Sequence, residues 1–222
     1  MDIAKLVLEY IRAFVWPVTL VAALALFRKE LAVLLARLRK AALPGGVTLD
    51  FPEEVQAARS LSEEVRKAQK PPEQKRGPAL PLNEVNARLL SLKLQPSPSG
   101  LDFSYYRTLA EQDPNLALAG LRMEMETMAR NLAVGFNVAL SARDSAGSLL
   151  RRLRQAGAIT SEQAELGESI LNLCNQALHG TRVSLNEAEA VIDIAEVLRQ
   201  QYISWLSWGF PDGWQPKNVR AG

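Results

Sequence analysis

The sequence contains few of the residues that build common catalytic and metal centres. It has one cysteine, Cys174, and one histidine, His179, among 222 residues. A single cysteine excludes an intrachain disulfide and a thiolate-rich metal site, and it agrees with a reducing compartment. A single histidine excludes a histidine cluster within one chain. There is also no glycine-rich phosphate loop and no obvious internal repeat. We therefore expect neither a metal site nor a cofactor.

Charge is nearly balanced over the chain but unevenly distributed along it. Residues 1–100 hold 15 Lys and Arg against 10 Asp and Glu, a net of +5, whereas residues 101–222 hold 11 against 14, a net of −3. The basic first part suits a segment beside anionic lipid. The mildly acidic second part is a poor surface for binding nucleic acid, so nucleic acid is not a favoured partner.

One long uncharged run, Ala13–Phe27, stands near the start of the chain. Extended back to Leu6 it spans 22 residues, or about 33 Å as a helix, which is enough to cross the hydrocarbon core of a bilayer. Five Lys and Arg follow the uncharged run Ala13–Phe27 within thirteen residues, and two, Lys5 and Arg12, precede it. Because cations are retained on the cytoplasmic side, the pattern predicts a single-pass inner-membrane anchor with the C-terminal domain in the cytoplasm.

Two other interpretations of this run stay open. A cleavable signal peptide would have Ala23-Leu24-Ala25 as its small-x-small cleavage site. An amphipathic helix that is buried or lies in the membrane interface is the other alternative.

The segment that follows is predicted to connect the anchor to a folded domain. Residues 1–43 form the anchor and a basic juxtamembrane helix, which Pro44-Gly45-Gly46 ends. Residues 44–100 form a neck and a proline-rich linker. Within them the pattern predicts a short strand over Val47–Phe51, a solvated helix or stalk over Pro52–Lys70, and a weak helix over Leu82–Leu92.

Residues 101–206 carry a strongly helical pattern. Apolar residues recur at spacings of three and four, and each predicted helix start has a capping signal. The signals are Asp113-Pro114, Ser145, Thr160 with Gln163, and Ser184 with Glu187. Together with a helix near Asp102–Gln112, they predict an all-α fold, in which an antiparallel bundle of four or five helices follows the anchor and linker.

A polar stripe lies on the predicted helix Thr160–His179. Glu168, Asn172, Asn175 and His179 follow one another at steps of four, three and four, so they share one face. One interpretation is a small binding or catalytic site, since an imidazole titrates near neutral pH. The other is that His179 only interacts with the carbonyl groups and dipole at the end of its helix.

The segment Cys174-Asn175-Gln176-Ala177-Leu178-His179-Gly180, late in a helical bundle, resembles the terminal motif of HEPN domains. In that superfamily an Arg, a polar residue, three further residues and a His end one helix. Asn175 and His179 match, whereas Cys174 stands at the Arg position. A neutral thiol cannot make the bidentate contact that a guanidinium makes with a phosphate. Arg182, three residues beyond His179, is a candidate substitute.

The chain is also similar to bacterial membrane proteins that have an N-terminal span and a HEPN-like domain, through Asp113-Pro114, Leu118–Arg122 and Asn175-x-Ala177-x-His179-Gly180. The resemblance implies a homodimer in which two motifs face each other. We expect a membrane-tethered binding or regulatory module that is catalytically degenerate and self-associating, with a protein partner as a further expectation. The alternative is a metal-independent endoribonuclease that uses His179 and Asn175. The expected binding residues are Glu168, Asn172, Asn175, His179 and Arg182.

Residues 207–222 are predicted to form an aromatic tail. Trp205, Trp208, Phe210 and Trp214 crowd around a Pro211-Asp212-Gly213 turn. These rings either fold back over the bundle or form an exposed aromatic hook for a partner or the membrane surface.

Overall fold

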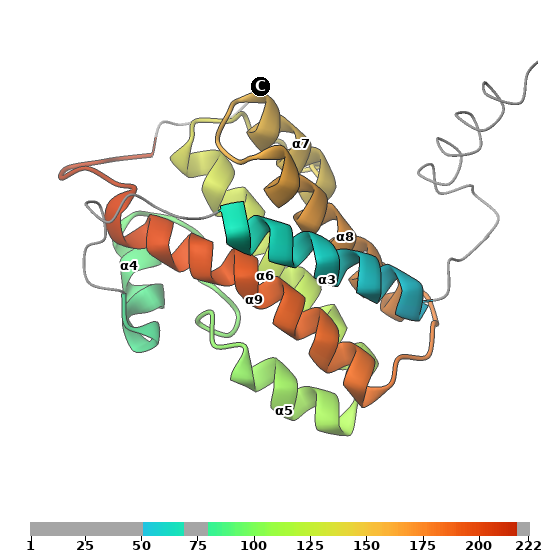
Figure 1. The fold of residues 1–222 in the computed structure, drawn as a ribbon. Helices are drawn as coiled ribbons and strands as arrows, with labels where there is room; N and C mark the ends of the chain where they lie inside the picture. Colours follow the sequence, from blue (N-terminus) through green and yellow to red (C-terminus); the bar gives the residue numbers. More distant parts are fainter. Residues whose placement is uncertain (1–50, 69–79, 217–222) are drawn as a thin grey trace, which may run out of the picture. The chain divides into compact units, whose positions relative to one another are not determined.

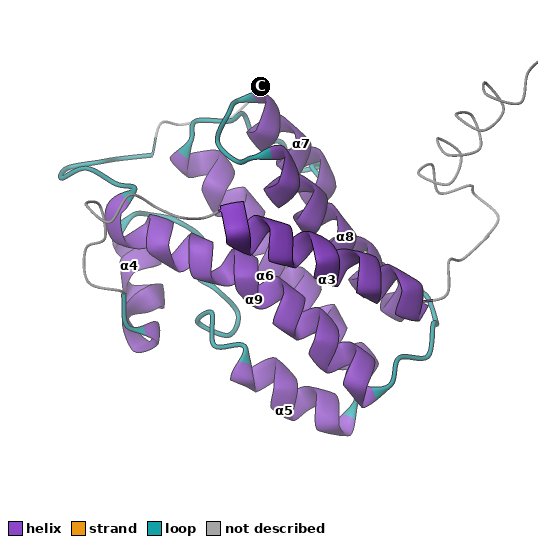
Figure 2. Ribbon diagram, in the orientation of Figure 1, coloured by secondary structure: helices purple, strands orange, loops and turns teal. Residues whose placement is uncertain are grey.

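The computed structural model describes residues 51–68 and 80–216, and within these ranges every regular element is a helix (Figures 1 and 2). The predicted all-α class is confirmed for this part of the chain. No described helix is both long and apolar enough to cross a bilayer. The predicted anchor lies outside the described residues.

The elements are α3 (Phe51–Ala68), the short 3-10 helix η2 (Leu82–Glu84), α4 (Val85–Ser91), α5 (Ser104–Gln112), α6 (Pro114–Gly135), α7 (Ala146–Gln155), α8 (Ser161–Leu178) and α9 (Leu185–Trp208).

Three long helices, α6, α8 and α9, contact one another and form the centre of the bundle. Each remaining long helix covers a groove between two of them. Helix α3 packs on α8 and α9, α5 packs on α6 and α9, and α7 packs on α6 and α8 (Figure 1). The short α4 contacts α9. These contacts bury apolar side chains in one continuous core, which is the usual source of helix stability in water.

The predicted helix starts are confirmed by their capping bonds. The Asp113 carboxylate accepts a hydrogen bond from the amide of Leu116 at 3.0 Å, ahead of Pro114. Ser145 caps α7 in the same way. Thr160 and Ser184 each form a complete capping box, with Gln163 and Glu187. These bonds satisfy amides that the first helical turn leaves without partners.

Helix α3 corrects the prediction of a solvated helix over Pro52–Lys70. Its apolar content is thin, but what there is lies on one face, and Phe51, Val55, Ala58 and Val65 are buried in the core. Glu54 also accepts a hydrogen bond from the Gln176 side chain of α8, at 2.5 Å. The apolar face of α3 is too narrow to identify as buried from the hydropathy of the sequence alone. The strand predicted over Val47–Phe51 is contradicted at Phe51, where α3 begins, and its other residues lie outside the described ranges.

Residues 80–100 correct the prediction of a linker. The predicted weak helix is present as η2 and α4, but its apolar side chains belong to the core, where Val85, Leu89, Leu92 and Leu94 are buried. The loop behind α4 is held by paired amide bonds from Asn131 to the backbone of Gln95 and from Asn86 to that of Ser97. The prolines therefore shape a packed loop in this segment.

A buried carboxylate completes the attachment of this loop. Glu124 of α6 is fully buried and accepts hydrogen bonds from Ser97, from the amide and hydroxyl of Ser99, and from the hydroxyl of Tyr106 at 2.8 Å. Burial, and then the charge of Glu124, raise the pKa of Tyr106. Tyr106 reaches this position because it lies against Gly120, where a Cβ atom would come within 2.6 Å of its ring. We call Glu124, Ser97, Ser99 and Tyr106 the Glu124 cluster.

The aromatic residues at the end of α9 and just after it fold back over the bundle, apart from Trp208. Trp205 and Phe210 are buried, and their ring centroids lie 4.6 Å apart. Phe210 also contacts the ring of Trp214. Trp208 differs, because 55% of it is exposed. Trp205, Phe210 and Trp214 thus fold back over the bundle, and of the four clustered rings only Trp208 is largely exposed.

Candidate functional site

The polar stripe of α8 lines a cleft between α6, α7 and α8. Three of its predicted members, Glu168, Asn172 and Asn175, border a cavity of about 290 Å³. Its other polar walls are Arg122 of α6, Arg151 of α7 and the start of α7 at Ser145–Gly147. We call this cavity the α8 cleft. The structure therefore brings together three predicted site residues and two arginines that the sequence did not assign to it.

Arg122 provides the central contact of the α8 cleft. Its Nε donates a hydrogen bond to Oδ1 of Asn175 at 2.7 Å, and its side chain is 37% exposed. A guanidinium thus lies beside Asn175 although the adjacent position 174 holds a cysteine. Cys174 faces the core instead, and its burial raises the pKa of its thiol to about 12. The sequence signal was the Leu118–Arg122 segment, but spacing alone does not show that α6 crosses α8 here.

The two arginines of the α8 cleft are each paired with a carboxylate. Arg151 lies 3.4 Å from Glu168, and Arg122 lies 3.8 Å from Glu126, one turn along its own helix. Glu126 also pairs with Arg130. The cations of the cleft are thus partly neutralised by neighbouring acids, which weakens their attraction for a polyanion.

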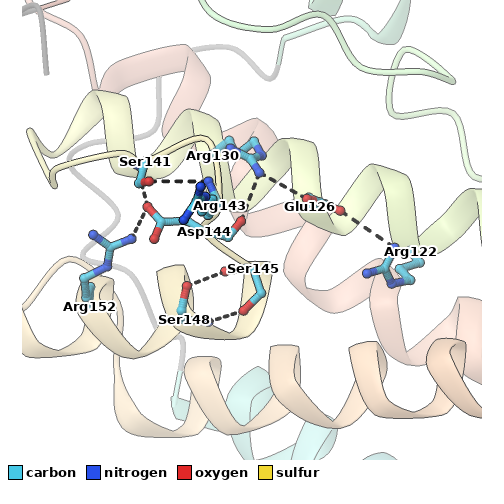
Figure 3. A network of polar contacts seen from close by, with 9 residues as sticks. All are labelled: Arg122, Glu126, Arg130, Ser141, Arg143, Asp144, Ser145, Ser148 and Arg152. Atoms are coloured by element: carbon cyan, nitrogen blue, oxygen red, sulfur yellow. Dashed lines mark hydrogen bonds and ion pairs between the residues drawn. The ribbon is translucent and has the colours of Figure 1, made fainter. Parts of the chain in front are cut away.

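A chain of polar contacts continues from the α8 cleft to the loop before α7 (Figure 3). Arg130 donates to the backbone oxygen of Asp144 at 3.0 Å, and the Asp144 carboxylate pairs with Arg152. The amide of Ser141 and then the Arg152 guanidinium hold the pKa of Asp144 below its usual range. This chain fixes the loop that places the first residues of α7 at the edge of the cleft.

His179 does not line the α8 cleft. It is the exposed C-terminal cap of α8, and its backbone amide donates to the carbonyl of Asn175 at 2.9 Å. It lies one turn beyond Asn175 on the same side of the helix. Arg182 is exposed in the following loop and does not border the cleft either. The predicted five-residue set is therefore divided: three residues line the cleft, and two lie past the end of α8.

Asn115 is a further polar residue that the sequence did not single out. Its side-chain amide donates to the carbonyls of Ala177 and Thr181, both at 2.7 Å, and its oxygen accepts from the amide of Val183. These three bonds tie the start of α6 to the last turn of α8 and to the loop between α8 and α9. They fix the loop that carries His179 and Arg182.

The chemistry that this arrangement offers is recognition through amides and guanidinium groups. Asn172 and Asn175 present amides, and Arg122 and Arg151 present planar donors that suit carboxylate or phosphate oxygens. Among the described residues no group of histidine, cysteine and acidic side chains is arranged to hold a metal ion.

Comparisons of this chain with protein-family models, with curated proteins and with solved structures found no match. The geometry of the α8 cleft is therefore the basis for a functional proposal.

Proposed function

We propose that the helical bundle is a binding and regulatory module that self-associates through the face formed by α6 and α8. The observation that carries this proposal is the Arg122–Asn175 contact, which places a half-exposed guanidinium and an amide in an open cleft. Such a pair can donate across a symmetric interface to the same face of a second copy. The resemblance to HEPN domains favours the same arrangement, in which two motifs face each other.

Exposed apolar side chains on α6 and at the end of α8 support this interface. Leu116 and Met123 are more than half exposed and lie seven residues apart on one face of α6. Leu178, at the end of α8, is 48% exposed. The bond from Asn115 to Ala177 brings this end of α8 against the start of α6. An interface here would bury an apolar centre next to polar donors, which is typical of homodimers.

Binding is favoured over catalysis because the reactive groups lie apart. His179 is outside the α8 cleft, Cys174 is buried, and the arginines of the cleft are engaged by Asn175, Glu126 and Glu168. A general base must come within hydrogen-bond reach of the proton that it removes. An acidic second half of the chain, with a net charge of −3, also disfavours a nucleic-acid substrate.

Sedimentation of the full chain tests self-association. We expect a dimer whose dissociation constant rises at least tenfold in Arg122→Ala and in Asn175→Ala, with helicity unchanged by circular dichroism. Arg143→Ala, which removes an exposed arginine outside the cleft, is the matched control and should sediment like the wild type. Cleft variants that sediment like this control would refute the proposed interface.

The proposal also includes a membrane tether. The run Leu6–Phe27 and the cations behind it support a single inner-membrane span, with the bundle in the cytoplasm. Alkaline carbonate should leave the chain in the membrane pellet, and a C-terminal reporter should respond as a cytoplasmic protein does. Release into the supernatant, or a periplasmic C-terminus, would contradict the tether without bearing on self-association.

A metal-independent ribonuclease is the second candidate, and Arg122 is the observation that favours it. The guanidinium that is missing at position 174 is supplied beside Asn175 from another helix. Incubation of the purified chain with RNA in EDTA tests this candidate. Cleavage that is lost in both His179→Ala and Arg122→Ala would establish it and would overturn our preference for a non-catalytic module.

A further inference from the structure

A larger hollow lies between α6, the last turns of α9 and the start of α8. Its volume is about 640 Å³, within the range of about 300–1,000 Å³ that small-molecule sites occupy. It shares no lining residue with the α8 cleft. We call it the α6–α9 cavity. Nothing in the proposed interface uses it.

The walls of the α6–α9 cavity are mainly apolar and adaptable. Met125 and Met128 line it from α6, and Trp205 and Trp208 line it from α9. Methionine side chains adjust to irregular ligands, and tryptophan offers a large rigid apolar face. Trp205 lies directly against α6 because residue 135 is glycine, where a Cβ atom would overlap the indole ring. The cavity thus suits an apolar body of moderate size.

The polar groups of the α6–α9 cavity indicate that such a ligand carries a hydrogen-bond acceptor. Two of the lining side chains, Gln201 and Tyr202, have a buried polar atom without a hydrogen-bond partner in the described part of the chain. In Gln201 that atom is Nε2, because Oε1 already accepts from Gln163 at 2.8 Å. An unpaired buried donor destabilises the protein until an acceptor reaches it.

No charged side chain is present among the described lining residues of this cavity. Burying an ion without a counter-charge is strongly unfavourable, so the lining disfavours a carboxylate or an ammonium group. A neutral oxygen acceptor satisfies the donor of Gln201 without this cost. The lining therefore selects an uncharged molecule.

We infer that the α6–α9 cavity binds a small uncharged amphiphile, with an aliphatic body and a carbonyl oxygen, of the fatty acyl ester class. The aliphatic chain packs against Met125, Met128 and Trp205. The carbonyl oxygen accepts a hydrogen bond from Nε2 of Gln201.

Thermal unfolding of the full chain in lipid nanodiscs tests this inference with three matched probes. Methyl decanoate carries the acceptor, decane lacks it, and decanoate adds a charge. At ten times its dissociation constant, methyl decanoate should raise Tm by about 3–6 °C. At the same concentration as the ester, decane should give a smaller rise in Tm, and decanoate should give none.

Two variants separate the cavity from other binding surfaces. Ser204 is an exposed residue that lines the cavity, so Ser204→Phe should block entry and abolish all shifts. Gln201→Leu removes the donor and should make the shifts from the ester and from decane equal. Circular dichroism checks that both variants retain their helices.

Three results would overturn the inference. One is equal shifts from all three probes, and another is an ester shift that survives in Ser204→Phe. The third is a wild type that shows no shift although the double variant Leu20→Ser with Leu24→Ser does. In that case the apolar run of the chain itself would occupy the cavity, and no external ligand would be needed.

Discussion

Helix α6 carries two polar sites that differ in almost every physical respect. Glu124 and Arg122 are two residues apart, and at 100° per residue they point to opposite sides of the helix. Glu124 is fully buried, with several hydrogen-bond donors and no cationic partner among its contacts. Arg122 is partly exposed and faces an open cleft. One side of α6 thus holds the fold together, and the other remains accessible to a partner.

The difference shows how to separate structural from functional polar residues. A buried polar group that is fully hydrogen-bonded specifies one arrangement of the chain, and its loss is costly. A partly exposed charged pair contributes little to stability, because water competes for both partners. Substitutions on the two sides of α6 should therefore affect different measurements.

The largest effect is expected from Glu124→Ala. This change leaves the donors of Ser97, Ser99 and Tyr106 without an acceptor in a buried site, so the free energy of unfolding should fall by about 3–5 kcal/mol. Urea unfolding measures the loss. Glu124→Gln is the matched control and should lose less, because its oxygen still accepts. A loss below about 1 kcal/mol would remove the distinction between the two sides of α6.

The next effect is expected from Asn115→Ala. One hydrogen bond to the last turn of α8 and two to the loop between α8 and α9 are lost, and the free energy of unfolding should fall by about 2 kcal/mol. Hydrogen exchange of the amide of Val183 should also accelerate. A stable variant with an unchanged exchange rate would mean that the loop is held by other contacts.

The buried thiol makes the free energy of unfolding depend on pH. The pKa of Cys174 is raised to about 12, against about 8.5 for a free thiol. The contribution of the protonated thiol to the free energy of unfolding is complete below pH 8.5. It is lost as pH rises towards 12, and about 1 kcal/mol is lost between pH 8.5 and 9.5. Subtracting the free energy of unfolding of Cys174→Ala from that of the wild type, at each pH from 8.5 to 9.5, isolates the contribution of the thiol. The native thiol should also resist alkylation at pH 8.

The smallest stability effects are expected at His179, at the exposed end of α8, and at Arg122 of α6. His179→Gln should cost about 0.3–1 kcal/mol, the value of a surface interaction with a helix dipole, and Arg122→Ala should cost a similar amount. The two variants should differ in self-association, since Arg122 lines the α8 cleft and His179 lies beyond it. Arg122→Ala should weaken the dimer more than His179→Gln does. A dimer that weakens equally in both variants would place His179 in the interface beside Leu178, and the α8 cleft would no longer be its centre.

The sequence predicted the helices of the second half well because their signals are local. Asp113, Thr160 and Ser184 mark helix starts by bonds within three residues. The failures involve contacts between distant segments. The burial of α3 depends on a groove between α8 and α9, and the packing of residues 80–100 depends on Glu124 and Asn131. For the same reason Asn175 was predicted as a site residue, whereas its partner Arg122, 53 positions earlier, was not.

The position of α3 has a mechanical consequence. Phe51 is the first described residue, and α3 lies along α8 and α9 with its buried residues in a single row. A tensile load applied at Phe51 is therefore carried first by this row, and by the bond between Glu54 and Gln176, before any load reaches the α6–α8 pair. Helix α3 is therefore the first packed element of the described chain to bear such a load.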